Sequence, residues 1–102
     1  MNQNRWQKLS LMEQMANIGA EVGRAINWKD KDKDMARNAF YRALELFILT
    51  KTDPKNSKRL KEIGRSQEMF GDWFLDINQY QSTAEEWQRY FWQFNYAVRL
   101  NR

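Results

Sequence analysis

The chain has 102 residues, of which 42% are hydrophobic and 29% charged, and its formal net charge is +4 at pH 7. This length supports one modest hydrophobic core, and the composition excludes a disordered chain, so we predict a single soluble domain over residues 1–102. Four glycines and one proline are too few for the regular turns of a strand-rich fold, so long helices are favoured.

Neither cysteine nor histidine is present in the chain. Disulfides, thiolate nucleophiles, cysteine-type zinc sites and histidine general bases are therefore excluded. We expect no enzymatic activity, no catalytic residues, no metal site and no cofactor. The first residues, MNQNRWQKLSLMEQM, lack the apolar run of a signal peptide, and no segment reaches the roughly 18 apolar residues of a membrane span. A cytoplasmic protein without a membrane partner is expected.

The first predicted helix covers residues 10–27. Ser10 and Glu13 match a capping box, in which each residue bonds the backbone of the other. Apolar residues then recur at the spacing of one helix face, namely at Leu11, Met15, Ile18, Val22 and Ile26. Gly19 and Gly23 lie one turn apart beside this face, and their missing side chains would let a second helix approach closely.

The stretch WKDKDKD, residues 28–34, has aspartates at alternate positions, as a calcium loop does. A loop that begins at Asp30 needs Gly at its sixth position and Glu at its twelfth, but Met35 and Tyr41 stand there. We therefore interpret the stretch as a solvated connector. Asp34 would lie near the N-terminus of the next helix, where the helix dipole favours a negative charge.

The second helix is predicted over residues 34–51. Its main apolar face comprises Ala36, Ala39, Phe40, Ala43, Leu44 and Phe47. Tyr41, Ile48 and Leu49 point elsewhere, which predicts burial on more than one side. The helix should end before Pro54, because proline disfavours helix in the residue that precedes it.

The third helix is predicted over residues 57–76, and its inward residues are Leu60, Ile63, Phe70 and Phe74. Glu68, Asp72 and Asp76 follow one another at intervals of four and would share one helix face. One interpretation of these acids is a site for a divalent ion. A solvated or partner-facing acidic stripe is the preferred interpretation, since no phosphate-binding glycine loop or activated nucleophile accompanies them.

The fourth helix is predicted over residues 82–100, with a second capping box at Thr83 and Glu86. Its core face comprises Trp87, Tyr90, Phe91, Phe94 and Val98. Four amphipathic helices joined by short connectors predict an all-α fold, specifically an antiparallel four-helix bundle.

The opposite side of the fourth helix carries a second apolar stripe of Trp92, Tyr96 and Leu100. A monomeric bundle would leave these large side chains in water, which is unusual. The stripe therefore predicts a homo-oligomer with its interface at these three residues. Stacking of nucleic-acid bases beside Arg89 and Arg99 is the competing interpretation.

The charges of the chain are unevenly distributed. Residues 1–65 hold 14 Lys and Arg against 8 acids, whereas residues 66–86 hold five acids and no base. The stretch KTDPKNSKRLKEIGR, residues 51–65, concentrates the cations Lys51, Lys55, Lys58, Arg59, Lys61 and Arg65. Cations at a helix N-terminus oppose the helix dipole, so helix stability does not explain them. Contact with phosphates does explain them, and a solvated basic turn is the alternative.

The run RNAFYRALELFILTKTDPKNSKRLKEIGRSQEMF, residues 37–70, resembles the middle helices of small basic four-helix-bundle proteins related to the accessory variability determinant of diversity-generating retroelements. It also looks like a class of uncharacterised small bacterial and archaeal proteins. The resemblance covers about a third of the chain. It implies a ring-shaped homo-oligomer whose basic surface assists a reverse transcriptase and its RNA template. The implied contacts are Arg37, Arg42, Lys58, Arg59, Lys61 and Arg65.

The function expected from the sequence is that of a non-enzymatic, oligomeric binding or scaffold protein that engages RNA or a nucleoprotein enzyme. The expected nucleic-acid contacts are Arg37, Arg42, Lys51, Lys55, Lys58, Arg59, Lys61 and Arg65. The alternative is a protein-directed adaptor or antitoxin-like partner that recognises another protein through its acidic stripe.

Overall fold

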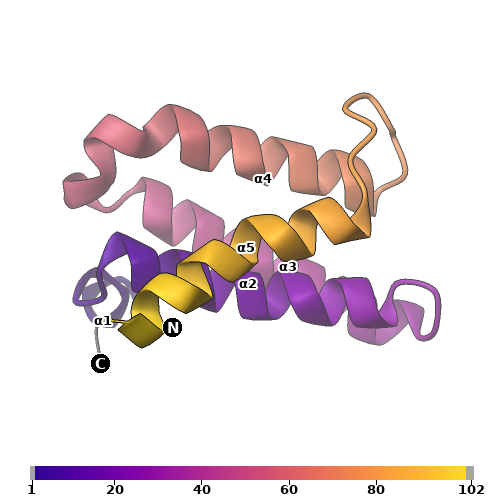
Figure 1. Ribbon diagram of the computed structural model, residues 1–102, viewed down its shortest axis with the longest axis horizontal. Helices are drawn as coiled ribbons and strands as arrows, with labels where there is room; N and C mark the ends of the chain where they lie inside the picture. Colours follow the sequence, from indigo (N-terminus) through magenta and orange to yellow (C-terminus); the bar gives the residue numbers. More distant parts are fainter. Residues whose placement is uncertain (1, 101–102) are drawn as a thin grey trace.

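The computed structural model describes residues 2–100, and every regular element among them is a helix (Figure 1). The all-α prediction is therefore confirmed. The elements in chain order are α1 (Gln3–Gln7), α2 (Leu11–Trp28), α3 (Lys33–Lys51), the 3-10 helix η1 (Pro54–Arg59), α4 (Leu60–Phe74) and α5 (Ala84–Leu100). Among these helices, none combines the length and the apolar character needed to cross a membrane.

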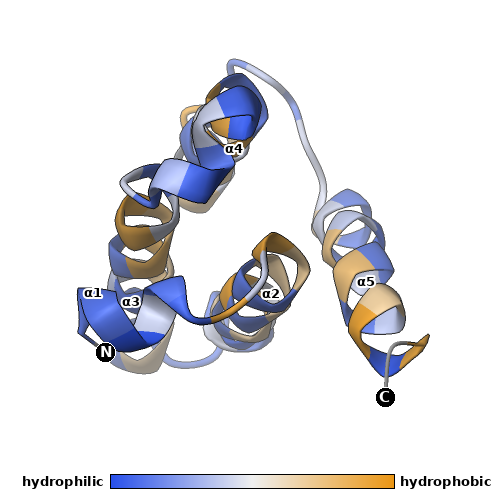
Figure 2. Cartoon of the chain, turned by 90° about the vertical axis from the view of Figure 1, so that its left-hand side faces the viewer, coloured by the Kyte–Doolittle hydropathy of each residue, from blue (hydrophilic) through white to orange (hydrophobic). Residues whose placement is uncertain are grey.

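Helix α2 is the central helix of the fold. Helix α2 packs against α3 on one side and α5 on the other, and α4 packs chiefly on α3 (Figures 1 and 2). Consecutive long helices run in opposite directions along the molecule in Figure 1. Helices α4 and α5 meet through side chains such as Phe70 and Trp87, whose ring centroids lie 5.8 Å apart.

The capping box predicted for the first long helix forms in the structure. Ser10 accepts a hydrogen bond from the Glu13 amide, and the Glu13 carboxylate accepts one from the Ser10 amide. In the KDKDKD stretch it is Asp32 that caps α3, because its side chain accepts from the amides of Asp34 and Met35. Asp34 lies in the first turn, where its charge complements the dipole. The connector interpretation is therefore confirmed.

The prediction for the third helix, residues 57–76, is wrong at both ends. The segment begins earlier as η1, where Asp53 accepts a hydrogen bond from the Lys55 amide, and it becomes α-helical only at Leu60. It stops at Phe74, and Asp76 has a left-handed φ of 58° that no α-helix accommodates. Helix α5 begins at Ala84, after the Thr83 hydroxyl oxygen accepts from the Glu86 amide.

The core combines small and aromatic side chains from every long helix. Its buried members are Trp6, Met15, Ile18, Val22, Ala25, Ala36, Ala39, Phe40, Ala43, Phe47, Ile63, Phe70, Trp87, Phe91 and Phe94. Leu60 is 43% exposed, so its predicted inward position is wrong. Helix α3 packs against both α2 and α4, which agrees with the predicted burial on more than one side. Of the three residues outside its main face, Leu49 is partly buried against the core, whereas Tyr41 and Ile48 are exposed.

A network of buried polar side chains joins α1 and α2 to the segment between α3 and η1. The side-chain amide of Gln14 donates to the Trp6 carbonyl oxygen at 3.0 Å and to the Asp53 carboxylate at 2.8 Å. Asn56 donates to Gln14 Oε1 and to the Thr50 carbonyl oxygen, both at 2.9 Å. The indole of Trp6 donates to the Thr50 hydroxyl oxygen at 2.9 Å. These bonds satisfy groups that would otherwise be buried without partners.

The carboxylate of Asp53 in this network should make stability depend on pH. Burial alone would raise its pKa, but hydrogen bonds from Lys55 and Gln14 outweigh burial and hold the pKa below the ordinary value of 3.8. A carboxylate of this kind stabilises the fold above its unfolded-state pKa, and that stability is lost as the pH falls through the lower folded-state pKa.

We therefore expect the free energy of unfolding to decrease as the pH falls through and below the ordinary aspartate pKa of 3.8, and Asp53→Asn to remove part of this decrease. Urea unfolding followed by tryptophan fluorescence measures it. The matched control is Asp30→Asn, which changes an exposed aspartate and should keep the wild-type dependence. An Asp53→Asn protein with the wild-type pH dependence would contradict the assignment.

The two glycines of α2 differ in what surrounds them. A Cβ atom at Gly19 would lie 2.8 Å from Cβ of Phe91 in α5, whereas nothing lies within 4 Å of a Cβ atom at Gly23. Close helix approach is therefore confirmed at Gly19 only. We expect Gly19→Ala to lower the free energy of unfolding by about 1–3 kcal/mol through overpacking.

Gly23→Ala is the control, and it should raise the free energy of unfolding by about 0.5–1 kcal/mol, because alanine has the better helix propensity. Urea denaturation monitored by circular dichroism compares the two variants. Equal effects of the two substitutions would show that α5 does not limit the space at Gly19.

Candidate nucleic-acid interface and neighbouring pockets

Four cations recur at short intervals along η1 and the first turns of α4. Lys55, Lys58, Lys61 and Arg65 recur at spacings of three, three and four residues, and all four are exposed. Residues three apart superimpose in a 3-10 helix, and residues three or four apart share one face of an α-helix. We call these four residues the basic row.

The pairing of these cations differs along the row. Lys55 forms an ion pair with Asp53 and donates to the Gln7 carbonyl oxygen at 3.0 Å, so it is partly committed to the fold. Lys58, Lys61 and Arg65 form no ion pair with any residue between 2 and 100. The charges of Lys58, Lys61 and Arg65 are therefore open to an external anion.

The remaining predicted contacts lie elsewhere. Arg59 is neutralised by Glu62, whose carboxylate accepts from its Nη2 at 2.6 Å and its Nε at 2.9 Å. Lys51 is half-buried and lines a groove between α3 and α4. Arg37 is exposed on α3, and Arg42 lines a pocket between α2 and α3. The structure thus brings together the basic row but not all eight predicted cations.

The apolar stripe of α5 is exposed in the single chain. Trp92, Tyr96 and Leu100 are 60%, 49% and 66% exposed, and the rings of Trp92 and Tyr96 stack with centroids 5.0 Å apart. Trp92 also borders a groove of about 170 Å3 between α2 and α5, which Ala20 and Gly23 line. The Trp92 ring therefore lies beside a groove lined by small residues such as Ala20 and Gly23.

The acidic residues do not form the stripe that the sequence predicts. Asp72 is buried, and its carboxylate accepts hydrogen bonds from the amides of Gln79 and Tyr80 at 2.9 and 3.1 Å, so it holds the loop before α5. Asp76 lies beyond the helix and pairs with Lys29 at 2.7 Å. Among residues 2–100, no group of three or more acids, histidines or cysteines could hold a metal ion.

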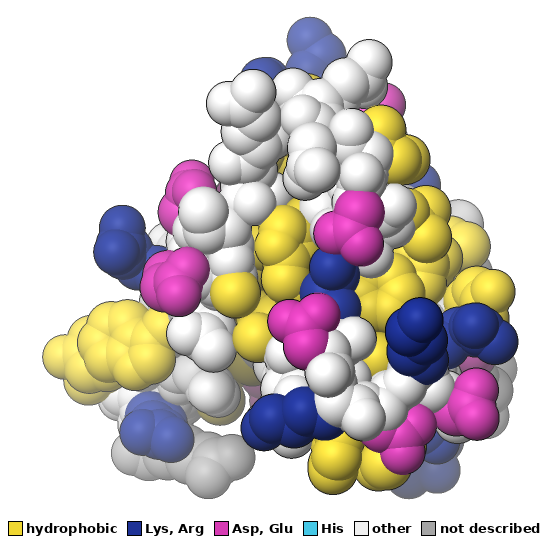
Figure 3. Space-filling view, turned by 90° about the vertical axis from the view of Figure 1, so that its right-hand side faces the viewer, with side chains coloured by type: hydrophobic (Ala, Val, Ile, Leu, Met, Phe, Trp, Pro, Cys, Tyr) yellow, Lys and Arg dark blue, Asp and Glu magenta, His cyan; other side chains and the backbone are white. Residues whose placement is uncertain are grey.

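The end of the molecule that carries this loop and the α2–α3 turn has mixed charge. Figure 3 shows Lys and Arg interspersed with Asp and Glu on this end, with hydrophobic side chains exposed between them. The acidic segment of residues 66–86 therefore does not produce a uniformly acidic surface on this face.

A pocket of about 310 Å3 is lined by residues of both α4 and α5. The Tyr90 hydroxyl lies 3.0 Å from the Ser66 hydroxyl oxygen and 3.3 Å from the Glu62 carboxylate. Burial raises the pKa of Tyr90 above its ordinary value of 10.0, so the phenol is neutral near pH 7. This hydrogen-bonded group therefore links the two helices without supplying a base near neutral pH.

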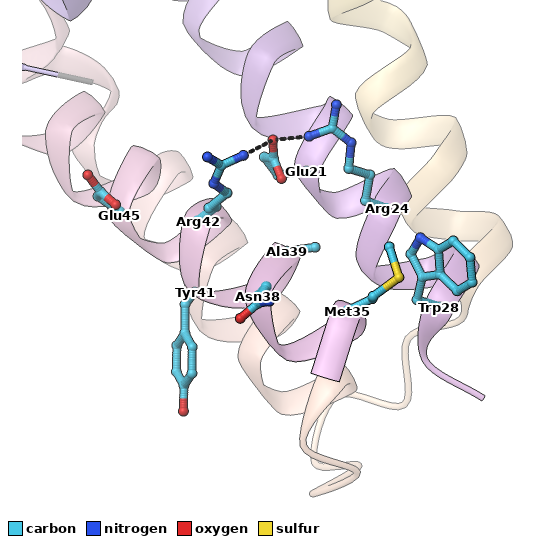
Figure 4. A pocket seen from close by; sticks show the side chains of 9 residues that line it. All are labelled: Glu21, Arg24, Trp28, Met35, Asn38, Ala39, Tyr41, Arg42 and Glu45. Atoms are coloured by element: carbon cyan, nitrogen blue, oxygen red, sulfur yellow. Dashed lines mark hydrogen bonds and ion pairs between the residues drawn. The ribbon is translucent and has the colours of Figure 1, made fainter. Parts of the chain in front are cut away.

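The pocket between α2 and α3 is larger, at about 510 Å3, and it contains a buried acid (Figure 4). Glu21 is 9% exposed, and its Oε1 lies 2.6 Å from Nη1 of Arg24 and 4.0 Å from Nη1 of Arg42. Trp28 and Met35 border the pocket on the side of the α2–α3 turn.

Comparison of the chain with protein-family models, with curated proteins and with solved structures finds no match. Sequence reasoning missed Glu21 as a pocket residue and Asp72 as a loop anchor. The signal for Glu21 was its position between Ile18 and Val22, where a charged residue directly borders an apolar helix face.

Proposed function

We propose that this protein is a non-enzymatic, self-associating binding protein that engages RNA, alone or within a nucleoprotein enzyme, through the basic row. We further propose that its four long helices form an antiparallel bundle whose role is to present this row on a rigid helix. The observation that supports the proposal is the regular spacing of four exposed cations, of which Lys58, Lys61 and Arg65 form no ion pair within the described chain.

The electrostatics of the row favour an anionic partner. The cations lie on η1 and the first turns of α4, where the partial positive charge of the helix N-terminus adds to their own. Glu62 is the only acid in the first turn of α4, and it is bound to Arg59. Neighbouring cations in the row are separated along the helix by about 5–6 Å, so an extended single strand could place successive phosphates against them.

The reverse-transcriptase accessory role is the finer form of this proposal, and it rests on the resemblance of residues 37–70. The adaptor role has less support, because Asp72 is turned inward to the loop and Asp76 is paired with Lys29. Only Glu68 of the three acids remains exposed on α4. An acidic recognition surface would therefore have few carboxylates to offer.

Self-association through α5 is the second component of the proposal. Trp92, Tyr96 and Leu100 together make an exposed apolar surface of the type that subunit contacts cover. A copy of the chain that covered this stripe would also double the number of basic rows, and linked rows bind one strand more tightly than single rows do.

The first test of the proposal removes two charges of the row. The Lys58→Ala, Lys61→Ala variant should bind a fluorescently labelled single-stranded RNA more weakly at low salt, because two phosphate contacts are lost. The slope of log affinity against log salt should decrease by about 1.4, at about 0.7 for each single-strand contact. Fluorescence anisotropy over a salt series measures both quantities.

The matched control is Arg89→Ala, Arg99→Ala, which removes the same charge from exposed positions of α5. Binding should be close to that of the wild type in this control. An equal loss in both variants would indicate non-specific attraction or stacking at α5. Failure of the wild-type protein to bind at about 50 mM salt, where electrostatic binding is strong, would refute RNA binding.

The second test concerns self-association. Trp92→Ala should weaken the assembly by about 2 kcal/mol or more, a roughly thirtyfold rise in the dissociation constant, if Trp92 is a central contact. Light scattering across a concentration series measures the mass. Ile48→Ala, which truncates a half-exposed apolar residue on α3, should leave assembly unchanged. A wild-type mass near 12.4 kDa at micromolar concentration would contradict self-association.

A further inference from the structure

Helix α5 lies at one edge of the molecule, and its outward side is not covered by any other described helix (Figure 2). Four exposed residues share this side, namely Glu85, Trp92, Tyr96 and Arg99. They follow one another at spacings of seven, four and three residues. At 3.6 residues per turn, these spacings place all four within about 60° of one another around the helix. We call these four residues the α5 face.

The groove between α2 and α5 runs beside the α5 face and is lined on its α2 side by small residues, Gly23 among them. Its volume of about 170 Å3 is several times the roughly 30 Å3 share of one water molecule, so it has room for a side chain. Nothing lies within 4 Å of a Cβ atom at Gly23. Packing within the chain therefore does not require glycine there, although alanine is the better helix former. The missing side chain keeps the groove open to a group from outside the chain.

The charges of the α5 face are arranged symmetrically about Trp92. Glu85 precedes Trp92 by seven residues and Arg99 follows it by seven, so each charge lies about 10 Å from Trp92 along the helix axis. Neither charge forms an ion pair with any residue between 2 and 100. Unlike charges at equal distances from the centre make a surface complementary to a copy of itself turned through 180°, as a two-fold contact requires. The partner that fits the α5 face is therefore a second copy of the chain.

The same charges determine the direction of the second copy. In an antiparallel pair of α5 helices that cross at Trp92, Glu85 of each copy lies opposite Arg99 of the other. In a parallel pair, each of these charges would lie opposite its own counterpart, and such like-charge contacts disfavour association. At an antiparallel crossing, each Trp92 also meets the part of the other copy that borders Trp92, which is the groove between α2 and α5.

We propose that two copies of the chain pair through antiparallel α5 helices, with Glu85 of each copy against Arg99 of the other and each Trp92 in the groove beside Gly23 of the other. This inference rests on the self-association in the proposed function and deepens it, because it names the partner surface and the direction of the contact. The two halves of the interface are related by a two-fold axis, so the interface joins exactly two copies.

The first experiment reverses the two charges of the α5 face and measures the Kd of the pair by analytical ultracentrifugation at low salt. Glu85→Arg and Arg99→Glu should each raise the Kd at least about tenfold, because two attractive contacts become repulsive. The double variant Glu85→Arg, Arg99→Glu should return to within about threefold of the wild type, because unlike charges again lie opposite each other. Both reversals oppose the dipole of α5, so a more stable helix does not explain this recovery. A double variant as weak as the single variants would overturn the antiparallel pair.

Reversal is the informative change at these positions. Neutral substitution of Arg99, as in the control for the basic row, removes only exposed ion pairs, which contribute little to binding. The apolar contact of Trp92 stays in place in that control.

The second experiment fills the groove. Gly23→Leu should raise the Kd of the pair at least about tenfold, because the leucine side chain takes the space of Trp92 from the other copy. The single chain has room for this side chain, and an unchanged circular dichroism spectrum checks that the fold is kept. Gly64→Leu is the matched control, since nothing lies within 4 Å of a Cβ atom at this glycine of α4 either, and it should leave the Kd unchanged. Equal effects of the two substitutions would rule out the groove as the seat of Trp92.

The outcomes separate this pairing from the proposed function. A wild-type protein that stays near 12.4 kDa at micromolar concentration would overturn both the self-association and the antiparallel pair. If such a monomer also lost RNA binding in Trp92→Ala, the α5 face would be a stacking platform for bases. Wild-type assembly that neither charge reversal nor Gly23→Leu weakens would leave self-association standing and overturn the α5 pair alone. An assembly of three chains would do the same, because a two-fold contact joins copies in twos.

Discussion

The hydrogen bonds of Gln14 are the interaction on which the rest of the architecture depends. One side-chain amide joins the carbonyl oxygen of Trp6, the carboxylate of Asp53 and the amide of Asn56. It thereby connects α1 and α2 to the segment between α3 and η1. Each of these buried polar groups would cost free energy without a hydrogen-bond partner. The segment between α3 and η1 therefore adopts the one geometry in which all of them are paired. That geometry sets the direction in which the chain leaves α3, and with it the course of the basic row.

The buried carboxylates of the protein fall into two kinds. Asp53 and Asp72 hold backbone amides at the start of η1 and in the loop after α4, so their charges organise turns. Glu21 has no backbone partner and lies at the base of an open pocket between two arginines. The first kind explains why connectors without glycine keep a defined shape. The second kind leaves one carboxylate oxygen buried without a hydrogen-bond partner.

The sequence predicts the helices well where local signals are strong. The Ser10 capping box and the period of the apolar residues locate α2 to within a residue, and proline locates the end of α3. Helix α1 was not foreseen, because its five residues are too few to show a period and its anchor is one tryptophan. The end of α4 was also missed, since Asp72 bonds the loop amides of Gln79 and Tyr80, contacts that no helix pattern reveals.

The site was predictable in part. The spacing of Lys58, Lys61 and Arg65 is visible in the sequence, but the neutralisation of Arg59 by Glu62 depends on side-chain geometry. The position of Arg42 beside Glu21 depends on how α2 and α3 pack, and sequence spacing within one helix does not contain this information. Long-range packing therefore decides which charges remain open to a partner.

The connections of α2 have a consequence for the order in which the fold assembles. Helices α2 and α3 are separated by residues 29–32 only, whereas residues 29–83 lie between α2 and α5. The entropy lost on closing a chain segment grows with its length, so the α2–α3 hairpin forms at the lower entropic cost. The contact of α5 with α2, where Phe91 lies against Gly19, therefore carries the larger entropic cost. The contact between Phe91 and Gly19 thus closes the longer of the two chain segments that leave α2.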